Sequence, residues 1–250
     1  MPTLEMEIDR LIKDLKSQSQ EVDAGHWQGV STESHPEMLT KEILNAWMVA
    51  PIPPTIDELV EQVKPNMPWA EEEFQERVGG EAHNPHRAMF NWPWWRGQID
   101  EQMSHTYSER FWPSYDEPNK LWRKGVRYRY GDLADVINLL HDHPQTRQAT
   151  FPIFFPEDTG AIHGGRIPCT LHYHFLLREN RLNVWYPIRS CDAVRHFRDD
   201  VYMAARLCQW MLTQLKPAFD TDTLWEDVIP GHLYFTAYSF HIHRADEHLL

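Results

Sequence analysis

The residues best suited to chemistry gather in one stretch of the chain, between positions 166 and 215. Cys169 precedes a predicted strand, the run Arg189-Ser190-Cys191-Asp192 follows a second predicted strand, and Asp199 and Asp200 begin a long predicted helix. A thiol nucleophile accompanied by a guanidinium, a hydroxyl and carboxylates is the set of groups that covalent modification of a nucleotide requires. These polar residues all stand at the ends of predicted elements, so we expect them to converge on one site.

The elements that position these residues are predicted from hydrophobic periodicity. Residues 170–177 (TLHYHFLL) alternate between two faces as a half-buried strand does, and residues 182–186 (LNVWY) form a second strand after a turn at Glu179-Asn180. The apolar residues between Val201 and Leu215 recur at three- and four-residue spacings, which predicts a buried helix that ends before Pro217.

The order of these motifs resembles the thymidylate synthase superfamily. The resemblance rests on Pro168-Cys169 for the nucleophile, Arg189-Ser190-Cys191-Asp192 for an Arg-Ser-x-Asp motif, and Asp200 for the residue that reads the pyrimidine. The resemblance extends outward to three further motifs. Pro144-Gln145-Thr146-Arg147 matches the phosphate-arginine segment, and Tyr115 matches the active-site tyrosine. Ser239-Phe240-His241-Ile242-His243 matches a His-x-Tyr motif, with His243 in place of tyrosine. The match covers roughly residues 115–243.

The resemblance implies an α+β fold, with a thymidylate synthase-like mixed β-sheet packed with helices. The length of 250 residues suits a single domain over 1–250, in which residues 1–25 form an N-terminal amphipathic helix and a linker. The resemblance also implies 5,10-methylenetetrahydrofolate as cofactor, and a homodimer in which phosphate-binding arginines are shared across the interface.

Asp200 decides the branch that the chain resembles within the superfamily. Thymidylate synthases carry Asn here, which hydrogen-bonds N3–H and O4 of uracil, whereas a carboxyl group can accept from the amino group of cytosine and share a proton with its N3. The deoxycytidylate hydroxymethylases have this pattern, so the resemblance implies conversion of dCMP to 5-hydroxymethyl-dCMP. We expect the helix N-terminus to favour the anionic form of Asp200. The alternative is that Asp199 or Asp200 is only a helix cap.

The remaining site residues follow from the resemblance. Cys169 would attack the pyrimidine, while Glu71 and Tyr115 would manage protons and water. The substrate-binding set would be Arg147, Arg189, Ser190, Asp192, Asp200, His241 and His243, with the two histidines facing the 3′-hydroxyl and Asp192 facing the base or the pterin. Among the four glutamates of residues 71–76 we choose Glu71, because it shares a helix face with Phe74 and Val78.

Composition narrows the class of protein. A formal net charge of −13 argues against nucleic-acid binding and requires any phosphate to be held by locally gathered arginines. No apolar run reaches the length of a membrane span, and no signal peptide is visible at the N-terminus. Three cysteines without a zinc-ribbon spacing favour a reduced cytoplasmic protein.

Several alternatives stay open at this point. Cys169 could be an inert core residue, and the substrate could be CMP, or dUMP as in thymidylate synthase. A protein that binds nucleotides without catalysis would be indifferent to loss of Cys169. A metalloenzyme is the rival from another class, because His172-x-His174 and His241-x-His243 each place two imidazoles on one strand face.

Outside the motif-bearing stretch, the chain shows structural patterns. We expect amphipathic helices over 4–15 and 131–144, a helix over 38–49, and a helix opened by a capping box from Thr55 to Glu58. Residues 83–123 are rich in Trp and His, and could line a site for a base or pterin ring or simply fill the core.

Overall fold

The computed structural model describes residues 1–27, 30–92, 103, 105–113, 131–160, 167–216 and 223–250. Its helices are α1 Leu4–Gln18, α2 Ile56–Val63, α3 Trp69–Val78, α4 Tyr107–Phe111, α5 Leu133–Asp142 and α6 Phe197–Leu215. Its strands are β1 Gln20–Val22, β2 His26–Trp27, β3 Val30–Ser31, β4 Thr40–Pro51, β5 Thr150–Pro152, β6 His172–Arg178, β7 Arg181–Asp192 and β8 Ile229–His243. Short 3-10 turns lie at Pro36–Met38, Ala88–Asn91, Pro156–Gly160, Thr223–Trp225 and Arg244–Leu249.

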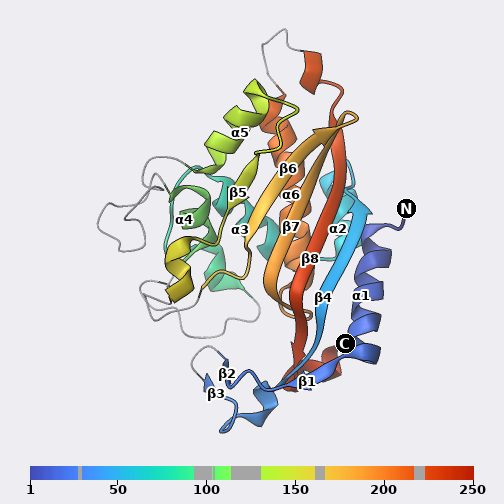
Figure 1. Cartoon of the computed structure of the whole chain (residues 1–250), viewed down its shortest axis with the longest axis vertical. Coiled ribbons are helices and arrows are strands. Elements are labelled where there is room, and N and C mark those ends of the chain that lie inside the picture. Colours follow the sequence, from blue (N-terminus) through green and yellow to red (C-terminus); the bar gives the residue numbers. More distant parts are fainter. Residues whose placement is uncertain (28–29, 93–102, 104, 114–130, 161–166, 217–222) are drawn as a thin grey trace.

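A mixed six-stranded sheet forms the frame of the molecule, in the order β1-β4-β8-β7-β6-β5 (Figure 1). Strands β7 and β8 run parallel at its centre, and the other neighbouring pairs are antiparallel. A parallel pair needs a crossover connection, and α6 lies between the two strands in the sequence. Cys169, the end of β7 and the start of α6 are therefore held by neighbouring parts of one rigid frame.

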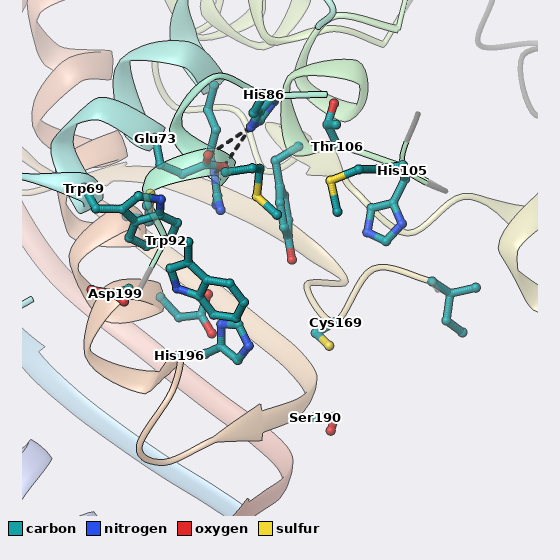
Figure 2. A pocket seen from close by; sticks show the side chains of 17 residues that line it. Trp69, Glu73, His86, Trp92, His105, Thr106, Cys169, Ser190, His196 and Asp199 are labelled. Carbon is teal, nitrogen blue, oxygen red and sulfur yellow. Dashed lines mark hydrogen bonds and ion pairs between the residues drawn. The ribbon is translucent and has the colours of Figure 1, made fainter. Parts of the chain in front are cut away.

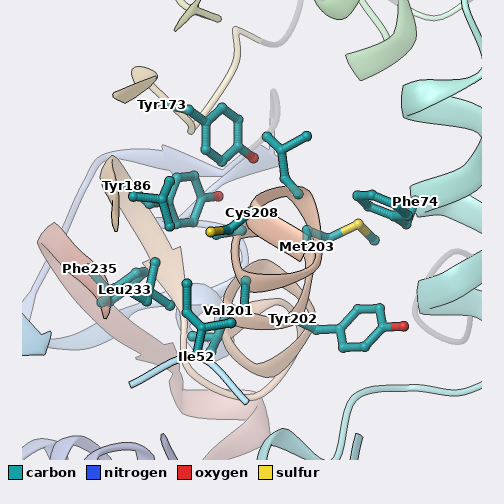
Figure 3. Close-up of a cluster of buried hydrophobic side chains, with 14 of the residues drawn as sticks. Ile52, Phe74, Tyr173, Tyr186, Val201, Tyr202, Met203, Cys208, Leu233 and Phe235 are labelled. Atoms are coloured by element: carbon teal, nitrogen blue, oxygen red, sulfur yellow. The ribbon is translucent and has the colours of Figure 1, made fainter. Parts of the chain in front are cut away.

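The buried helix α6 lies against the inner face of the sheet (Figure 3). Its side chains contact strand residues such as Tyr186 and Phe235 on one side, and Phe74 of α3 on the other. Tyr173 and Tyr186 of neighbouring strands stack with ring centroids 4.9 Å apart. The predicted strand-turn-strand-helix series is confirmed, although β7 continues to Asp192 and α6 already begins at Phe197.

One prediction about the elements is wrong, because residues 38–49 contribute to a strand and not a helix. Strand β4 pairs with β8 along most of its length and with β1 at its start. Its inward residues Ala46, Met48 and Ala50 are buried, while Trp47 between them is exposed. Small or apolar residues on both faces hide the period of two, and the pairing with β8 overrides the local helix preference.

The predicted helices near the N-terminus and before β5 are confirmed, and local capping explains where they begin. Thr55 accepts a hydrogen bond from the amide of Glu58 at 3.3 Å to start α2. Asp132 forms a capping box with Asp135 at the start of α5. Among the described residues, the helices are too short or too polar to cross a lipid bilayer.

Figure 1 shows one face of the sheet that the described helices leave uncovered, and large side chains lie on this outer face. Trp185 and Tyr234 stack there with ring centroids 4.1 Å apart, and Trp47 and Tyr238 are more than half exposed. Exposed apolar surface of this kind marks an interaction surface. The inner face therefore belongs to the core of this chain, and the outer face is available to a partner.

Candidate active site

A pocket lies where α3, α4, the segment before β6 and the first turns of α6 meet (Figure 2). Its aromatic and apolar lining consists of Trp69, Met89, Trp92, Met103, Ile167 and Met203. Its polar lining consists of Glu73, Arg77, His86, His105, Thr106, Tyr107, Cys169, Ser190, His196, Asp199 and Asp200. An apolar cavity with convergent polar groups is the usual form of a small-molecule site.

Three of the predicted site residues line this pocket together. Cys169 is partly buried and forms no disulfide within the described residues, while Ser190 comes from β7 and Asp200 from the first turns of α6. These residues are separated in sequence by up to 31 positions, and the sheet and helix bring them to one cavity. The thiol, the hydroxyl and the carboxyl group are thus positioned to face the same bound molecule.

Arg189 holds the backbone of the thiol segment in place. Its main-chain amide donates to the carbonyl of Cys169 at 2.8 Å. Its guanidinium donates to the carbonyl oxygens of Pro168 at 2.9 Å and Ile167 at 3.0 Å. We predicted a phosphate contact for Arg189. The structure gives the side chain hydrogen bonds to two consecutive main-chain carbonyls directly before Cys169, and the phosphate contact stays a prediction.

The carboxyl group of Asp200 is poised to change its protonation near neutral pH. Burial raises its pKa to about 7, the negative charge of Asp199 adds to this, and Arg77 partly opposes it. The Cys191 thiol lies 3.9 Å from Oδ2 and donates to it. We expected the helix N-terminus to favour the anion, but the cost of burying the charge is larger.

Asp200 is not the helix cap that the alternative interpretation suggested. The N-cap position of α6 is His196, and the amide of Asp200 already donates to the His196 carbonyl at 2.8 Å. The carboxylate of Asp199 accepts hydrogen bonds from the backbone nitrogen of Asn66 at 2.8 Å and from its side-chain nitrogen at 2.7 Å. The side chain of Asp200 is therefore left to the pocket and to the groups beneath it.

A chain of hydroxyl groups runs beneath the thiol. The hydroxyl of Tyr107 lies 3.1 Å from that of Thr170, which lies 2.9 Å from that of Tyr186. Burial and, to a lesser extent, the charges of Cys169 and Asp200 together raise the pKa of Tyr107 to about 12. The Tyr107 phenol therefore stays protonated, and it can donate a hydrogen bond into the pocket.

The glutamate among the pocket-lining residues is Glu73, and the proton-handling role that we predicted for Glu71 stays a prediction. Glu73 is 1% exposed, accepts from Arg77 Nε at 2.9 Å, and lies 2.9 Å from Nδ1 of His86 (Figure 2). Burial opposes its ionisation, but His86 and Arg77 outweigh burial and hold the pKa of Glu73 below its usual value. Glu73 is therefore a carboxylate at neutral pH.

Glu71 is on a different side of α3, where it connects this helix to α6. It accepts from the hydroxyl of Tyr202 at 2.5 Å and from Arg206 at 3.2 Å, and it is partly exposed. Helix α3 is packed on two sides, against α4 as well as α6, so the face that Glu71 shares with Phe74 and Val78 does not decide which glutamate is most buried. The side that carries Glu73 and Arg77 is the one buried beneath α4.

His86 is fixed in one orientation by its partners. The amide of Ser108 donates to Nε2 at 3.0 Å, so Nε2 is the acceptor and Nδ1 carries the proton towards Glu73. The serine hydroxyl is 2.7 Å from Nε2 but is itself buried and bonded to the backbone of His83. This serine-histidine-glutamate series is therefore a scaffold for Glu73, and its hydroxyl is sealed from the pocket.

One wall of the pocket is aromatic. Trp69 and Trp92 lie with ring centroids 6.0 Å apart, and Trp92 stacks on His196 at 4.7 Å. Trp69 donates its indole N–H to the carbonyl of Ala88 at 2.8 Å, which fixes the orientation of the ring. Flat, rigid surfaces of this kind accept a planar heterocycle by stacking.

The other predicted residues lie apart from this lining. Arg147 is exposed, and Tyr115 falls outside the described residues. Asp192, His241 and His243 form a separate cluster at the ends of β7 and β8. Their predicted contacts with the sugar, the base or the pterin stay predictions.

Sequence reasoning missed Glu73, Arg77, His86, Tyr107 and His196, all of which line the pocket. A local signal existed for Tyr107, because Thr106 and Glu109 form a capping box that places this tyrosine at the start of α4. His196 directly precedes a predicted helix beside Asp199 and Asp200. The other three required knowledge of which helix face is buried.

Comparison with known proteins gives one clear result. No family model matches the sequence, and no curated protein matches it either. Among solved structures, a thermostable thymidylate synthase A from Bacillus subtilis matches 98% of this chain and 81% of its own, with a TM-score of 0.67 and 14% sequence identity. The predicted α+β class is confirmed, and this chain has the thymidylate synthase fold.

Proposed function

We propose that the protein is a pyrimidine nucleotide C5 hydroxymethyltransferase that converts dCMP to 5-hydroxymethyl-dCMP. The observation that carries the proposal is that Cys169 and Asp200 line one pocket in a chain with the thymidylate synthase fold. The thiol supplies a nucleophile, and the carboxyl group, with its pKa of about 7, can either accept or donate a proton towards N3 of a base.

Cys169 would begin the reaction by adding as thiolate to C6 of the pyrimidine. The electron pair of the C5–C6 double bond then becomes available at C5, which can form a bond to a one-carbon unit. Loss of the C5 proton, with cleavage of the bond between the one-carbon unit and the folate nitrogen, would release tetrahydrofolate and give an exocyclic methylene; water would add to it, and the thiolate would leave C6 to restore the ring. The thiol is thus regenerated, and one hydroxymethyl group replaces one hydrogen.

Asp200 would select the base. In its protonated form it donates to the unprotonated N3 of cytosine, and its other oxygen accepts from the exocyclic amino group. The Cys191 thiol at 3.9 Å and the nearby Tyr186 hydroxyl hold the carboxyl group from below. Cytosine is matched when the carboxyl oxygen that faces N3 carries the proton, whereas uracil, which presents N3–H and a carbonyl, is matched only when the proton is on the other oxygen.

Glu73 and Tyr107 would manage protons in place of the Glu71 and Tyr115 that we first expected. Glu73 is ionised and can orient or deprotonate the water that adds to the one-carbon unit. Tyr107 lies in the hydroxyl chain beneath Cys169 and can stabilise negative charge that develops on the ring.

The aromatic wall suits the implied cofactor. Trp69, Trp92 and His196 offer stacking surface for a pterin ring, with apolar side chains such as Met203 beside them. 5,10-Methylenetetrahydrofolate supplies a one-carbon unit at the oxidation level of formaldehyde. The ring would be held between this wall and the base, so that water entry is restricted to the side of Glu73.

We further propose a homodimer that joins through the outer face of the sheet. Supporting this are the stacked pair Trp185 and Tyr234 and the exposed Trp47 on that face. Arg147 is exposed next to the edge strand β5, where it could reach the pocket of a second subunit. Arginines shared between subunits would supply the local positive charge that a bound phosphate requires in a chain with a net charge of −13.

The test is turnover of dCMP, CMP and dUMP side by side with the folate, with products identified by mass. The wild type should form hydroxymethyl-dCMP, and Cys169→Ser should form none. Asp200→Asn should shift the ratio of kcat/KM from dCMP towards dUMP by about 10- to 100-fold, the cost of one mismatched buried hydrogen bond. Cys208→Ser is the matched control, since this thiol is buried against the Leu182 carbonyl. Turnover that survives Cys169→Ser would overturn the proposal.

A further inference from the structure

Three potential metal ligands meet at the ends of the two central strands. Asp192 is the last residue of β7, and His241 and His243 lie at the end of β8. One carboxylate oxygen and one nitrogen from each histidine all lie within 4.8 Å of one another. Asp192 and His241 are register partners in the parallel pair, so the sheet itself fixes their backbones.

Asp192 and His243 each use one side-chain atom in hydrogen bonds to the main chain. These bonds direct the other atom of each side chain at the cluster. Asp192 Oδ1 accepts from the amides of Val194 at 3.0 Å and Arg195 at 2.9 Å, while its Oδ2 lies 3.8 Å from His243 Nε2. His243 Nδ1 lies 3.2 Å from the carbonyl of Met38, so Nδ1 carries the proton and Nε2 holds a lone pair. Metal-binding residues are oriented by such outer hydrogen bonds.

His241 contributes an independent observation. Its Nδ1 is buried and makes no hydrogen bond within the described part of the chain. A buried polar atom in this state points to a partner such as water or an ion. The residue as a whole is only partly buried, which leaves a route from solvent to the cluster.

The surrounding charges favour a cation. The nearest guanidinium, that of Arg195, is directed to Asp246 at 2.7 Å and lies 3.8 Å from Asp192 Oδ2. Glu42 on β4 is the register partner of His241 and adds a negative charge next to it. Arg195 is thus flanked by two carboxylates, those of Asp246 and Asp192, while Glu42 lies next to His241.

We infer that Asp192, His241 and His243 bind a divalent transition-metal ion of the zinc and iron(II) type. Two imidazoles and one carboxylate are the ligand set of zinc sites and of iron(II) facial triads, and three protein ligands leave positions open to water or a small ligand. Ligand atoms around such an ion lie about 3–3.5 Å apart, given metal–ligand bonds of about 2.0–2.2 Å. Small side-chain rotations would close the observed spacing.

The second group of candidate ligands among the described residues has a less favourable charge environment for a cation. Glu73, Glu76 and His86 also lie close together, but Arg77 donates to Glu73 at 2.9 Å within the group. This guanidinium is closer to its carboxylate than Arg195 is to Asp192 at 3.8 Å, so it would repel an ion more strongly. The cluster at the ends of β7 and β8 is therefore the better site.

This inference is independent of the proposed hydroxymethyl transfer. It gives the His241-x-His243 pair a role different from the predicted contact with the 3′-hydroxyl, and the two are distinguished by binding of a metal in the absence of nucleotide. The open coordination positions would then receive an oxygen ligand directly on the ion.

The experiment titrates the full chain, stripped with a chelator, with Co²⁺ followed by visible absorption and with Zn²⁺ followed by calorimetry. We expect one ion per chain. Asp192→Asn keeps an oxygen for the Val194 and Arg195 amides but removes the ligand charge, and should weaken Co²⁺ binding at least about tenfold. His241→Gln should do the same, and serves if circular dichroism shows that Asp192→Asn disturbs the fold.

The matched control is the double variant His172→Asn with His174→Asn. These histidines form the other His-x-His pair, on the outer face of β6, without a carboxylate in the described cluster. This variant should bind Co²⁺ as the wild type does. Failure of the wild type to bind either ion, or binding by both Asp192→Asn and His241→Gln that is as tight as that of the wild type, overturns the inference.

Discussion

The guanidinium of Arg189 donates a hydrogen bond to the carbonyl oxygen of Pro168, the residue before the pocket thiol, at 2.9 Å. A second bond to Ile167 and the amide bond to Cys169 make this arginine a clamp on the thiol segment. The side chain that a sequence motif associates with phosphate thus positions the nucleophile in this structure. The phosphate must then find its positive charge at least partly elsewhere.

Replacing Arg189 by Lys separates these two roles. Lys cannot make the two-pronged contact, so the free energy of unfolding should fall by about 1–3 kcal/mol, measured by urea denaturation. If the side chain positions Cys169, kcat for dCMP should fall with little change in KM. A rise in KM with unchanged kcat and stability would instead assign Arg189 to the phosphate.

The raised pKa of Asp200 predicts a stability that depends on pH. The unfolded carboxyl group titrates near about 3.9 and the folded one near about 7, so the unfolded chain releases this proton first. Stability of the wild type should therefore fall as pH rises from about 4 to 7, through this group alone. Asp200→Asn lacks the titration and should be more stable than the wild type by roughly 2–4 kcal/mol at pH 8.

This difference is measured by urea denaturation of both proteins between pH 4.5 and 8. It should shrink as the pH falls towards 4, because the carboxyl group of the unfolded wild type then also begins to bind its proton. A difference that stays constant across the range would mean that Asp200 titrates normally. Asp227→Asn, which changes a carboxyl group on the exposed turn before β8, provides the control for a general charge effect.

Replacing Glu73 or Glu71 by Gln should have different effects on activity and on the free energy of unfolding. Glu73→Gln removes a carboxylate from the pocket and leaves Arg77 without its buried partner, so kcat should fall about 10²- to 10⁴-fold and stability by about 3–5 kcal/mol. Glu71→Gln removes a partly exposed ion pair with Arg206, so stability should change by about 1 kcal/mol or less.

Steady-state kinetics and thermal unfolding of the two variants, measured together, check this assignment. Glu71→Gln should retain wild-type kcat. If it is instead the variant that loses activity, while Glu73→Gln is merely unstable, our original choice from the sequence would stand.

The outer face of the sheet should support a dimer that a single charge disrupts. Trp185→Glu places a carboxylate in the stacked pair with Tyr234, and should convert a dimer of the wild type into a monomer. Met6→Glu on the exposed side of α1 introduces the same charge elsewhere and should leave the oligomer intact. Light scattering coupled to gel filtration reports the mass. A wild type that is monomeric at micromolar concentration contradicts the proposed interface.

Local patterns predicted the elements whose signals lie within a few residues of one another. Helices α1, α2, α5 and α6 follow from apolar spacing and caps, and the hairpin β6–β7 follows from alternation and its turn. Cys169, Ser190 and Asp200 were predicted as one site because they stand at the ends of those elements, and all three line the pocket. The family resemblance supplied their order and the expected fold.

Features that depend on distant partners escaped prediction. Strand β4 is a strand because β8 pairs with it, and no local pattern reveals a partner nearly two hundred residues away. Glu73 is buried because α4 covers its side of α3, while Glu71 meets Arg206 of α6. His86 and Tyr107 reach the pocket through contacts among short segments, whose packing the periodicity of a single helix or strand does not encode.

The pairing of β4 with β8 has a consequence for how the chain is made. Thr40 pairs with His243, so the centre of the sheet is completed only after β8 has left the ribosome. Until then the edges of β4 and β7 stand open, and each is a template for pairing with another chain. Folding of the sheet should accordingly be slow and wait for the synthesis of β8, and a chaperone that shields strand edges should raise the yield of the folded protein.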